Sequence, residues 1–273
     1  QMIGAKVARN SIIKRSQFCE NDVEILFESS IPSFQRFFAK PYLRKSKMIE
    51  FDKNDMQSFT LLRFHIPFLM NFQGSALVID PDIFQVKRGI EELLDFDFNT
   101  HSLYARRGLQ KNSWGSSAML ISCDQLRHWS LDDLIDKLHH GKIDYDDLIN
   151  LRLEEQPIGE LDKKWNEFDE INQNTILLHT TEKITQPWRA GLNLNSSIPP
   201  LLKYIPRAPL YKLFGKDLTL GREHPHEGIS NFFFNELAEC IASNIVSTEE
   251  LDDAIEKKYI RQDIHHKIRP FKI

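Results

Sequence analysis

The apolar run Ala76-Leu77-Val78-Ile79, which ends in Asp80-Pro81-Asp82, is the stretch of sequence that decides the fold. Four consecutive apolar residues without polar alternation are typical of a strand buried on both faces of a parallel sheet. Gly74 stands just before the run, where a glycine is suited to ending a preceding helix. A helix, a glycine, a buried strand and an acidic turn in this order predict an α/β fold.

Helical and strand patterns alternate on both sides of this run. Periodicity predicts helices at 3–14, 61–71, 90–94, 124–140, 229–243 and 248–258, and strands at 23–27, 100–106, 117–122 and 175–178. We therefore predict an α/β fold with a mostly parallel sheet flanked by helices and a C-terminal helical appendage. The expected domains are an α/β domain over 1–190 and a loop-rich, helical extension over 191–273 packed on the same domain.

The composition excludes several classes of protein. With 41% hydrophobic and 27% charged residues, the chain is an ordinary globular one and not a disordered, collagen-like or disulfide-scaffold protein. Its 35 basic and 39 acidic residues nearly balance, so the chain lacks the excess of positive charge that would attract a nucleic-acid backbone. Three widely spaced cysteines predict reduced thiols in a cytoplasmic setting. No apolar segment approaches the ~20 residues that span a bilayer.

Asp80 and Asp82 are the first candidate functional residues. Carboxylates that follow a buried strand lie at the sheet edge where α/β folds bind ligands, and paired carboxylate oxygens suit Mg²⁺ or Mn²⁺. A cation at this edge can also hold a diphosphate. The alternative is that Asp80-Pro81-Asp82 is an ordinary turn, because aspartate and proline both favour turns.

His179 ends another apolar strand and is the candidate third ligand. Imidazole is an acceptable ligand for Mn²⁺, and the hydroxyls of Thr180 and Thr181 are suited to phosphate oxygens. A lone histidine at a strand end is more often structural. Two strands with polar ends that meet at one edge nevertheless favour a single cation between them.

Other catalytic patterns are absent from the sequence. It contains no Gly-x-Gly-x-x-Gly, no phosphate-binding Gly-Lys-Ser/Thr and no Gly-x-Ser-x-Gly, which argues against dinucleotide sites, P-loops and nucleophile-elbow hydrolases. The histidine pairs His139-His140, His265-His266 and His224-Pro225-His226 have no supporting carboxylate at metal-binding helical spacing, so we expect them to be solvated. The alternative for His224 and His226 is that they line a pocket.

Four segments in order resemble bacterial glycosyltransferases of the GT-A fold, and most closely relatives of glycosyltransferase family eight. These segments are Arg63-Phe64-His65-Ile66-Pro67, Val78-Ile79-Asp80-Pro81-Asp82, Ser116-Ser117-Ala118-Met119-Leu120 and His179 followed by Gln186-Pro187-Trp188. The Asp-x-Asp motif alone is unspecific, whereas the ordered series spans most of the chain. The resemblance implies a retaining enzyme that uses a nucleotide-sugar donor and Mn²⁺ or Mg²⁺, with residues 1–190 as its GT-A-like, nucleotide-sugar-binding catalytic domain.

The resemblance also implies residue roles. Asp80, Asp82 and His179 correspond to the metal ligands, and the two aspartates also to donor-binding residues. Arg63 matches an arginine that helps to hold the donor, and Ser116 and Ser117 match a small polar pair in the sugar pocket. Gln156 resembles a catalytic element near the reacting sugar carbon, where its side-chain carbonyl would stabilise an oxocarbenium-like sugar.

The sequence departs from the family pattern in two places. After the histidine the family has a glycine and then Lys-Pro-Trp, whereas this chain is one residue longer and has Gln186 in place of the lysine. Lys183 or the threonines are then the expected pyrophosphate contacts. An apolar strand that supports the nucleotide base normally precedes the helix at 3–14, and this sequence begins at Gln1 without it. The expectation is a missing first strand, through either a fragmentary record or the loss of part of the donor site.

The sequence therefore predicts a metal-dependent, hexosyltransferase-like enzyme that moves a sugar from a nucleotide-diphosphate donor to a glycan, lipid-linked or protein acceptor. The alternatives are a catalytically silent GT-A-like domain that binds a nucleotide or a partner protein, and a metal-dependent phosphate hydrolase, which would need more ligands. A paired-carboxylate glycosidase lacks its acid and nucleophile. The expected location is the cytoplasm, free or peripheral at a membrane, without nucleic acid as a partner.

Overall fold

The computed structural model describes residues 2–38, 40–51, 58–98, 100–108, 113–194 and 220–271. The chain divides into two compact units, each assembled from separate segments. Unit 1 comprises 1–23, 81–88 and 167–273, and unit 2 comprises 24–80 and 89–166. These units differ from the two domains that the sequence predicts, with a boundary between 190 and 191. That domain boundary stays a prediction.

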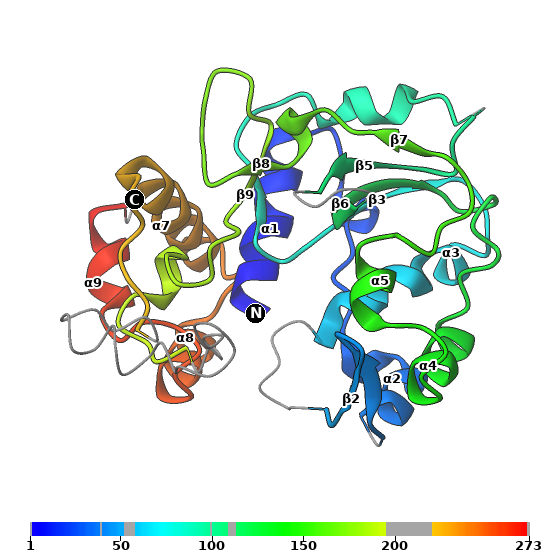
Figure 1. Ribbon diagram of the computed structural model, residues 1–273. Coiled ribbons are helices and arrows are strands. Elements are labelled where there is room, and N and C mark those ends of the chain that lie inside the picture. The colour runs from blue at the N-terminus through cyan, green and yellow to red at the C-terminus, as the bar shows by residue number, and fades with distance from the viewer. Residues whose placement is uncertain are drawn as a thin grey trace. The chain divides into compact units, whose positions relative to one another are not determined.

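Unit 2 is built on a four-stranded sheet in the order β3-β6-β5-β7. Strands β3 and β5 both pair antiparallel with β6, and β7 pairs parallel with β5. Helices α2, α4 and α5 lie to one side of this sheet (Figure 1). The elements of unit 2 are α2 (Pro32–Phe37), β1 (Tyr42–Arg44), β2 (Lys47–Ile49), α3 (Ile66–Leu69), β3 (Ser75–Ile79), β5 (Leu103–Arg107), β6 (Trp114–Ser122), α4 (Leu131–His139), α5 (Tyr145–Ile149) and β7 (Ile158–Glu160), with 3₁₀ helices at Glu28–Ser30, Ser58–His65, Ile90–Asp95 and Lys163–Trp165.

Unit 1 contains a smaller sheet in the order β4-β9-β8. Strand β9 lies in the centre, antiparallel to β4 and parallel to β8. The elements of unit 1 are α1 (Met2–Arg15), β4 (Ile83–Gln85), β8 (Glu167–Phe168), β9 (Leu177–His179), α7 (Glu227–Ala242), α8 (Thr248–Glu256) and α9 (Ile264–Ile268), with 3₁₀ helices at Glu20–Asp22, Pro187–Arg189 and Arg269–Phe271.

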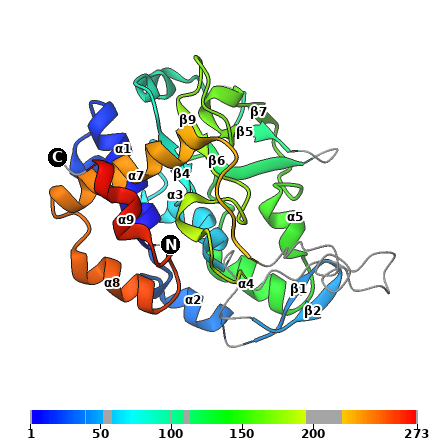
Figure 2. The same ribbon diagram turned by 90° about the vertical axis from the view of Figure 1, so that its left-hand side faces the viewer.

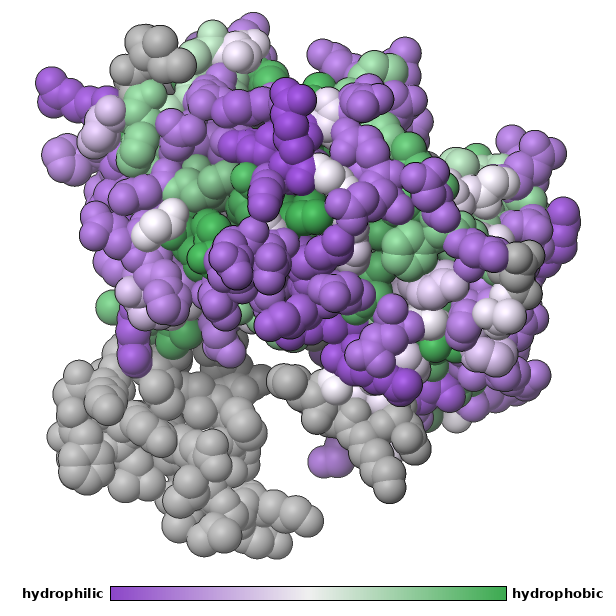
Figure 3. Space-filling view, turned by 90° about the horizontal axis from the view of Figure 1, so that it is seen from above, coloured by the Kyte–Doolittle hydropathy of each residue, from purple (hydrophilic) through white to green (hydrophobic). Residues whose placement is uncertain are grey.

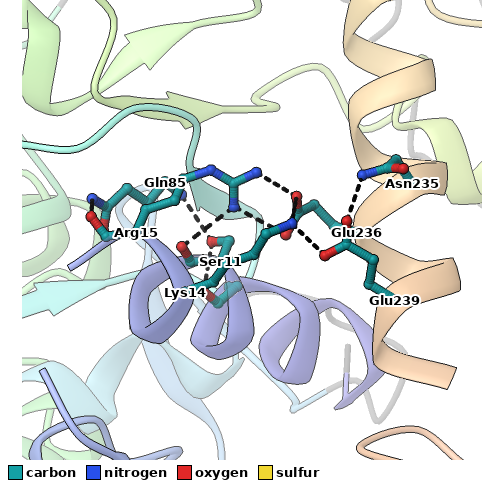
Figure 4. A network of polar contacts seen from close by, with 8 residues as sticks. Ser11, Lys14, Arg15, Gln85, Asn235, Glu236 and Glu239 are labelled. Carbon is teal, nitrogen blue, oxygen red and sulfur yellow. Dashed lines mark hydrogen bonds and ion pairs between the residues drawn. The ribbon is translucent and has the colours of Figure 1, made fainter. Parts of the chain in front are cut away.

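In unit 1, helix α1 from the N-terminal part of the sequence packs against helix α7 from the C-terminal part. They lie side by side, and their apolar residues form one buried cluster with β4 and with residues of α8 and α9 (Figure 2). Polar side chains add a second link, since the fully buried Glu236 of α7 pairs with Lys14 and Arg15 of α1 (Figure 4). Gln85 of β4 donates to the carbonyl of Arg15 at 3.1 Å.

The structure confirms the α/β class, and the helices expected at 3–14, 229–243 and 248–258 correspond to α1, α7 and α8. The strand pairing is more mixed than expected, because parallel pairing among the described strands is limited to β5/β7 and β8/β9, and β1 and β2 form a separate antiparallel pair. The run at 76–79 forms most of β3, but of these residues only Val78 is fully buried. The cause is that β3 lies at the edge of its described sheet.

Two other expectations were wrong. Residues 23–27 form no strand; the carbonyl of Val23 instead accepts a hydrogen bond from Arg9 Nε at 2.8 Å. The helix expected at 124–140 begins at Leu131, because Ser130 caps it and accepts from the backbone N–H of Asp133.

The described surface and thiols agree with an ordinary globular chain. Hydrophilic side chains predominate on the face shown in Figure 3, and hydrophobic ones occupy small separate areas among the described residues. Among these residues, no helix combines the length and the apolar character that a membrane crossing requires. All three cysteines are free thiols.

Candidate metal and donor site

Asp80 and Asp82 lie in the short turn between β3 and β4, and the boundary between the units falls inside this turn. The backbone N–H of Asp80 donates to Ser117 at 2.9 Å, which extends the pairing of β3 with β6. The carbonyl of Asp82 accepts from the N–H of Thr180 at 3.1 Å, which extends the pairing of β4 with β9. The two aspartates are therefore fixed by backbone pairing on each side of Pro81.

Strand register brings His179 to Asp82. Ile83, the first residue of β4, lies opposite His179 in the antiparallel pair. The imidazole Nε2 of His179 is 3.5 Å from Asp82 Oδ1, and the two side chains are 10% and 24% exposed. The ring of Phe168 packs edge-on against the imidazole, with ring centroids 5.5 Å apart. Sheet pairing thus aligns residues that are far apart in sequence.

The two aspartates and the histidine form a group of metal-ligand type. One ligand atom of each of Asp80, Asp82 and His179 lies within 4.8 Å of the others. No other trio of histidine, cysteine or acidic side chains meets this spacing in the described part of the chain. Two carboxylates and one imidazole are suitable ligands for Mn²⁺ or Mg²⁺, so the residues present fit a divalent cation.

Arg63 holds Asp80 from within unit 2. Its Nη2 is 2.6 Å from Asp80 Oδ2 and its Nε is 3.1 Å from Oδ1, and both side chains are largely buried. The Nη1 group donates to Ser116 Oγ at 2.5 Å, and Ser116 in turn donates to the carbonyl of Ile149. The predicted Arg63 and Ser116 are therefore brought together, with the guanidinium balancing one carboxylate charge.

Gln186 contacts the same aspartate as His179. Its side-chain amide, which is 2% exposed, donates from Nε2 to Asp82 Oδ2 at 2.8 Å and to the carbonyl of Thr180 at 2.9 Å. Both partners are acceptors, so the NH₂ group must face them. Its Oε1 is buried and has no hydrogen-bond partner among the described residues. The sequence had marked Gln186 only as a departure from a family pattern.

Arg189 is a basic residue of this region that the sequence analysis missed. It ends the one-turn 3₁₀ helix Pro187–Arg189 and is buried. Burial lowers the pKa of Arg189 to about 10, and the negative charge of Asp82 opposes that change. The available signal was a basic residue directly after Gln186-Pro187-Trp188, one of the segments that carry the family resemblance.

The other predicted residues have less defined surroundings. Ser117 is half-buried and accepts a hydrogen bond from Asn166 Nδ2 at 3.2 Å. Lys183 is exposed and lies in unit 1, between β9 and the 3₁₀ helix Pro187–Arg189. Gln156 is exposed in the loop between α5 and β7 of unit 2. The donor-binding and catalytic roles of these residues stay predictions.

No protein-family model matches this chain, and no curated protein matches its sequence. Among solved structures it is similar to the glycosyltransferase GlyE in Streptococcus pneumoniae TIGR4, with 14% identity and a TM-score of 0.45; the match covers 89% of this chain and 61% of that one. This chain therefore spans less than two thirds of the length of GlyE.

The structure is also similar to the galactosyltransferase LgtC. An active-site mutant of LgtC matches with 12% identity and a TM-score of 0.45, covering 68% of this chain and 85% of that one. LgtC in complex with donor and acceptor sugar analogues matches with 13% identity and a TM-score of 0.42 over the same shares. Because these identities and scores are low, a function for this chain has to rest on its own residues.

Proposed function

We propose that this protein is a metal-assisted glycosyltransferase of GT-A type that moves a sugar from a nucleotide-diphosphate donor to an acceptor. The observation that carries the proposal is the grouping of Asp80, Asp82 and His179 within 4.8 Å at the ends of β3 and β9. These are the residues at which the sequence resembles relatives of glycosyltransferase family eight, and the same resemblance supports a retaining outcome.

Asp80, Asp82 and His179 would hold the cation, Mn²⁺ or Mg²⁺. When bound there, a divalent cation supplies electrostatic stabilisation of the charge that grows on a leaving diphosphate. Asp80 pairs with Arg63, and the buried Arg189 interacts electrostatically with Asp82, so arginines partly offset both carboxylate charges of the trio. Imidazole coordinates a cation as an uncharged ligand, so His179 would add a ligand without adding negative charge, and the bound cation would still attract a diphosphate.

The remaining predicted residues have roles in donor binding and transfer. Arg63, Ser116 and Ser117 would line the donor side, and Lys183 would contact the pyrophosphate. Gln156 would stabilise an oxocarbenium-like sugar through its side-chain oxygen. No dedicated base is assigned, because in a front-face retaining reaction the leaving phosphate accepts the proton of the acceptor hydroxyl.

The deciding experiment is calorimetric titration of a nucleoside diphosphate with and without Mn²⁺. We expect Mn²⁺ to tighten binding to the wild-type protein, and we expect Asp82→Asn and His179→Ala each to abolish that tightening. Slow hydrolysis of a nucleotide-sugar in the absence of acceptor then separates a transferase from a silent nucleotide-binding domain.

A matched control is available on α8 and α9. Asp252 and His265 also form an Asp–His pair in unit 1, at 2.7 Å, but both are exposed. Among the described residues, no third acidic, cysteine or histidine side chain joins them at ligand spacing. Asp252→Asn and His265→Ala should therefore leave the Mn²⁺ effect unchanged. Unaltered titrations for both Asp82→Asn and His179→Ala would contradict the metal site, and binding without donor hydrolysis would favour the silent domain.

A further inference from the structure

Asp169, the residue directly after β8, makes hydrogen bonds to both sides of Thr180. Its backbone N–H donates to the carbonyl of His179 at 3.0 Å. Its carboxylate Oδ2 accepts from the backbone N–H of Thr181 at 3.2 Å and from the hydroxyl of Thr181. Asp169 thus fixes the two peptide units that follow the imidazole.

The end of β9 is held on its other edge as well. Because β9 lies between β4 and β8, Asp82 and Asp169 flank the same strand end. The carbonyl of Asp82 accepts from the N–H and the hydroxyl of Thr180 at 3.1 and 3.2 Å. The backbone that carries His179 is therefore anchored from both neighbouring strands.

The second carboxylate oxygen of Asp169 is occupied by His224. The imidazole Nε2 of His224 lies 3.4 Å from Asp169 Oδ1, and the histidine side chain is 1% exposed. The expectation that His224 is solvated was therefore wrong, because its ring is buried against this carboxylate. Its Nδ1 accepts from the backbone N–H of His226 at 3.0 Å, which leaves Nε2 to donate. This contact orients the carboxylate so that Oδ2 faces Thr181.

The backbone of Asp169 explains why this residue type stands here. Its φ of +49° lies in the left-handed region, which aspartate, asparagine and glycine adopt more readily than other residues. Among these three, only aspartate and asparagine also carry a side-chain acceptor, and only aspartate offers two equivalent ones. The conformation and the hydrogen bonds together select aspartate.

We propose that Asp169 is a positioning residue that sets the direction of the His179 imidazole for cation binding, with His224 holding its carboxylate. This proposal rests on the proposed function, since it concerns the same cation site. Hydrogen bonds to a metal ligand fix its geometry, and mutating such a partner typically costs about 10–100-fold in metal affinity or activity. Asp169 bonds to the backbone that carries His179 and not to its ring, so we expect an effect at the lower end of this range.

The test compares Asp169→Gly with Asp169→Asn in the full chain. Glycine keeps the backbone conformation but removes both acceptors, so we expect Mn²⁺ affinity, measured by calorimetry and by Mn²⁺ electron paramagnetic resonance, to fall at least ~10-fold. Asparagine keeps an acceptor for Thr181, and His224 can change tautomer and donate to the carbonyl of His226 instead. We therefore expect Asp169→Asn to restore most of the affinity.

Asn244→Gly is the matched control. Asn244 also has a left-handed φ, of +57°, and lies in unit 1 after α7. Its substitution should leave Mn²⁺ affinity unchanged, which separates the loss of hydrogen bonds from the effect of a new glycine. Melting temperatures of all variants show whether each one is folded.

The imidazole signals of the cation-free protein provide a readout that is independent of metal binding. In ¹H–¹⁵N spectra, with the His179 signals assigned by their absence in His179→Gln, we expect Asp169→Gly to shift and broaden them, and Asp169→Asn to leave them nearly in place. If the wild-type protein binds no Mn²⁺, the proposed function fails and these spectra alone decide the role of Asp169. Unchanged His179 signals in Asp169→Gly would overturn it.

Discussion

At the scale of single residues, Asp82 is the point where the contacts of the site meet. One carboxylate oxygen faces His179 and the other accepts from Gln186. A glutamine amide orients the carboxylate and adds no positive charge to the one that Arg189 already places near Asp82. The family pattern has a lysine here, whose expected contact is the donor pyrophosphate. Without nucleotide, an ammonium in the place of Gln186 would instead pair with Asp82 and compete with the metal.

Gln186→Lys should therefore weaken metal binding. The ammonium can reach the same two acceptors, so the protein should stay folded, but its charge opposes a divalent cation beside Asp82. We expect the dissociation constant for Mn²⁺ to rise at least ~10-fold, equivalent to ~1.4 kcal/mol, in calorimetric titrations without nucleotide.

Gln17→Lys adds the same charge at an exposed position in unit 1 and serves as the control. It should leave the Mn²⁺ dissociation constant unchanged. Equal Mn²⁺ affinity in wild type and Gln186→Lys would show that Gln186 does not govern the charge at Asp82.

At the scale of secondary-structure elements, the pairing of α1 with α7 depends on a buried carboxylate. Glu236 is fully buried, and its Oε2 accepts from Arg15 Nη1 at 3.0 Å (Figure 4). The Nζ atom of Lys14 lies 3.4 Å from Glu236 Oε1. Neighbouring Glu239 also pairs with Lys14, but its side chain is 23% exposed. The two glutamates on one helix therefore differ mainly in burial.

Glu236→Ala should be strongly destabilising. It leaves the half-buried guanidinium of Arg15 without its carboxylate, and breaking a buried ion pair by removing one partner costs ~3 kcal/mol or more. Urea denaturation followed by circular dichroism measures the free energy of unfolding. Glu239→Ala, at the more exposed pair, should lower it by less than ~1 kcal/mol. An equal loss of unfolding free energy in Glu236→Ala and Glu239→Ala would show that burial of the carboxylate does not decide its contribution to stability.

At the scale of the whole molecule, each unit draws on distant segments of the chain. In unit 1, Arg261 follows α8 and donates to the carbonyl of Pro187 at 3.1 Å, while its backbone N–H donates to Trp188 at 2.8 Å. Its guanidinium also pairs with Glu223 and Asp263. The C-terminal helices thus support the turn that carries Gln186.

The ion pairs of Arg261 should make the free energy of unfolding depend on pH. Hydrogen bonding from Arg261 lowers the pKa of Glu223 from its ordinary 4.5 to about 2, with a further contribution from Lys267. A lowered folded-state pKa stabilises the protein above pH 4.5, and that contribution is lost as the pH falls from 4.5 towards 2.

Urea midpoints of the wild type and of Glu223→Gln between pH 6 and 2.5 test this dependence. The variant should be less stable than the wild type at pH 6, and the difference should shrink as the pH falls because protonated Glu223 resembles glutamine. A difference that stays constant over this range would contradict the assignment.

The sequence predicted those parts of the fold that depend on local pattern. The periodicity of 229–243 and 248–258 matched α7 and α8 because one face of each helix is apolar and buried. The pattern failed at 23–27, where a side chain of α1 occupies a backbone acceptor, and at 76–79, where position in the sheet decides burial. Neither circumstance is visible in a short window of sequence.

For the candidate site, the sequence by itself determined which residue types stand at the strand ends, namely Asp80, Asp82 and His179. Only the tertiary structure decided that β4/β9 register brings His179 within 3.5 Å of Asp82, and that Gln186 and Asp169 hold these two residues. The physical reason is that ligand type follows from side-chain chemistry, which is local. Spacing, burial and hydrogen bonding depend on strand pairing between segments about 100 residues apart, and no local pattern encodes that pairing.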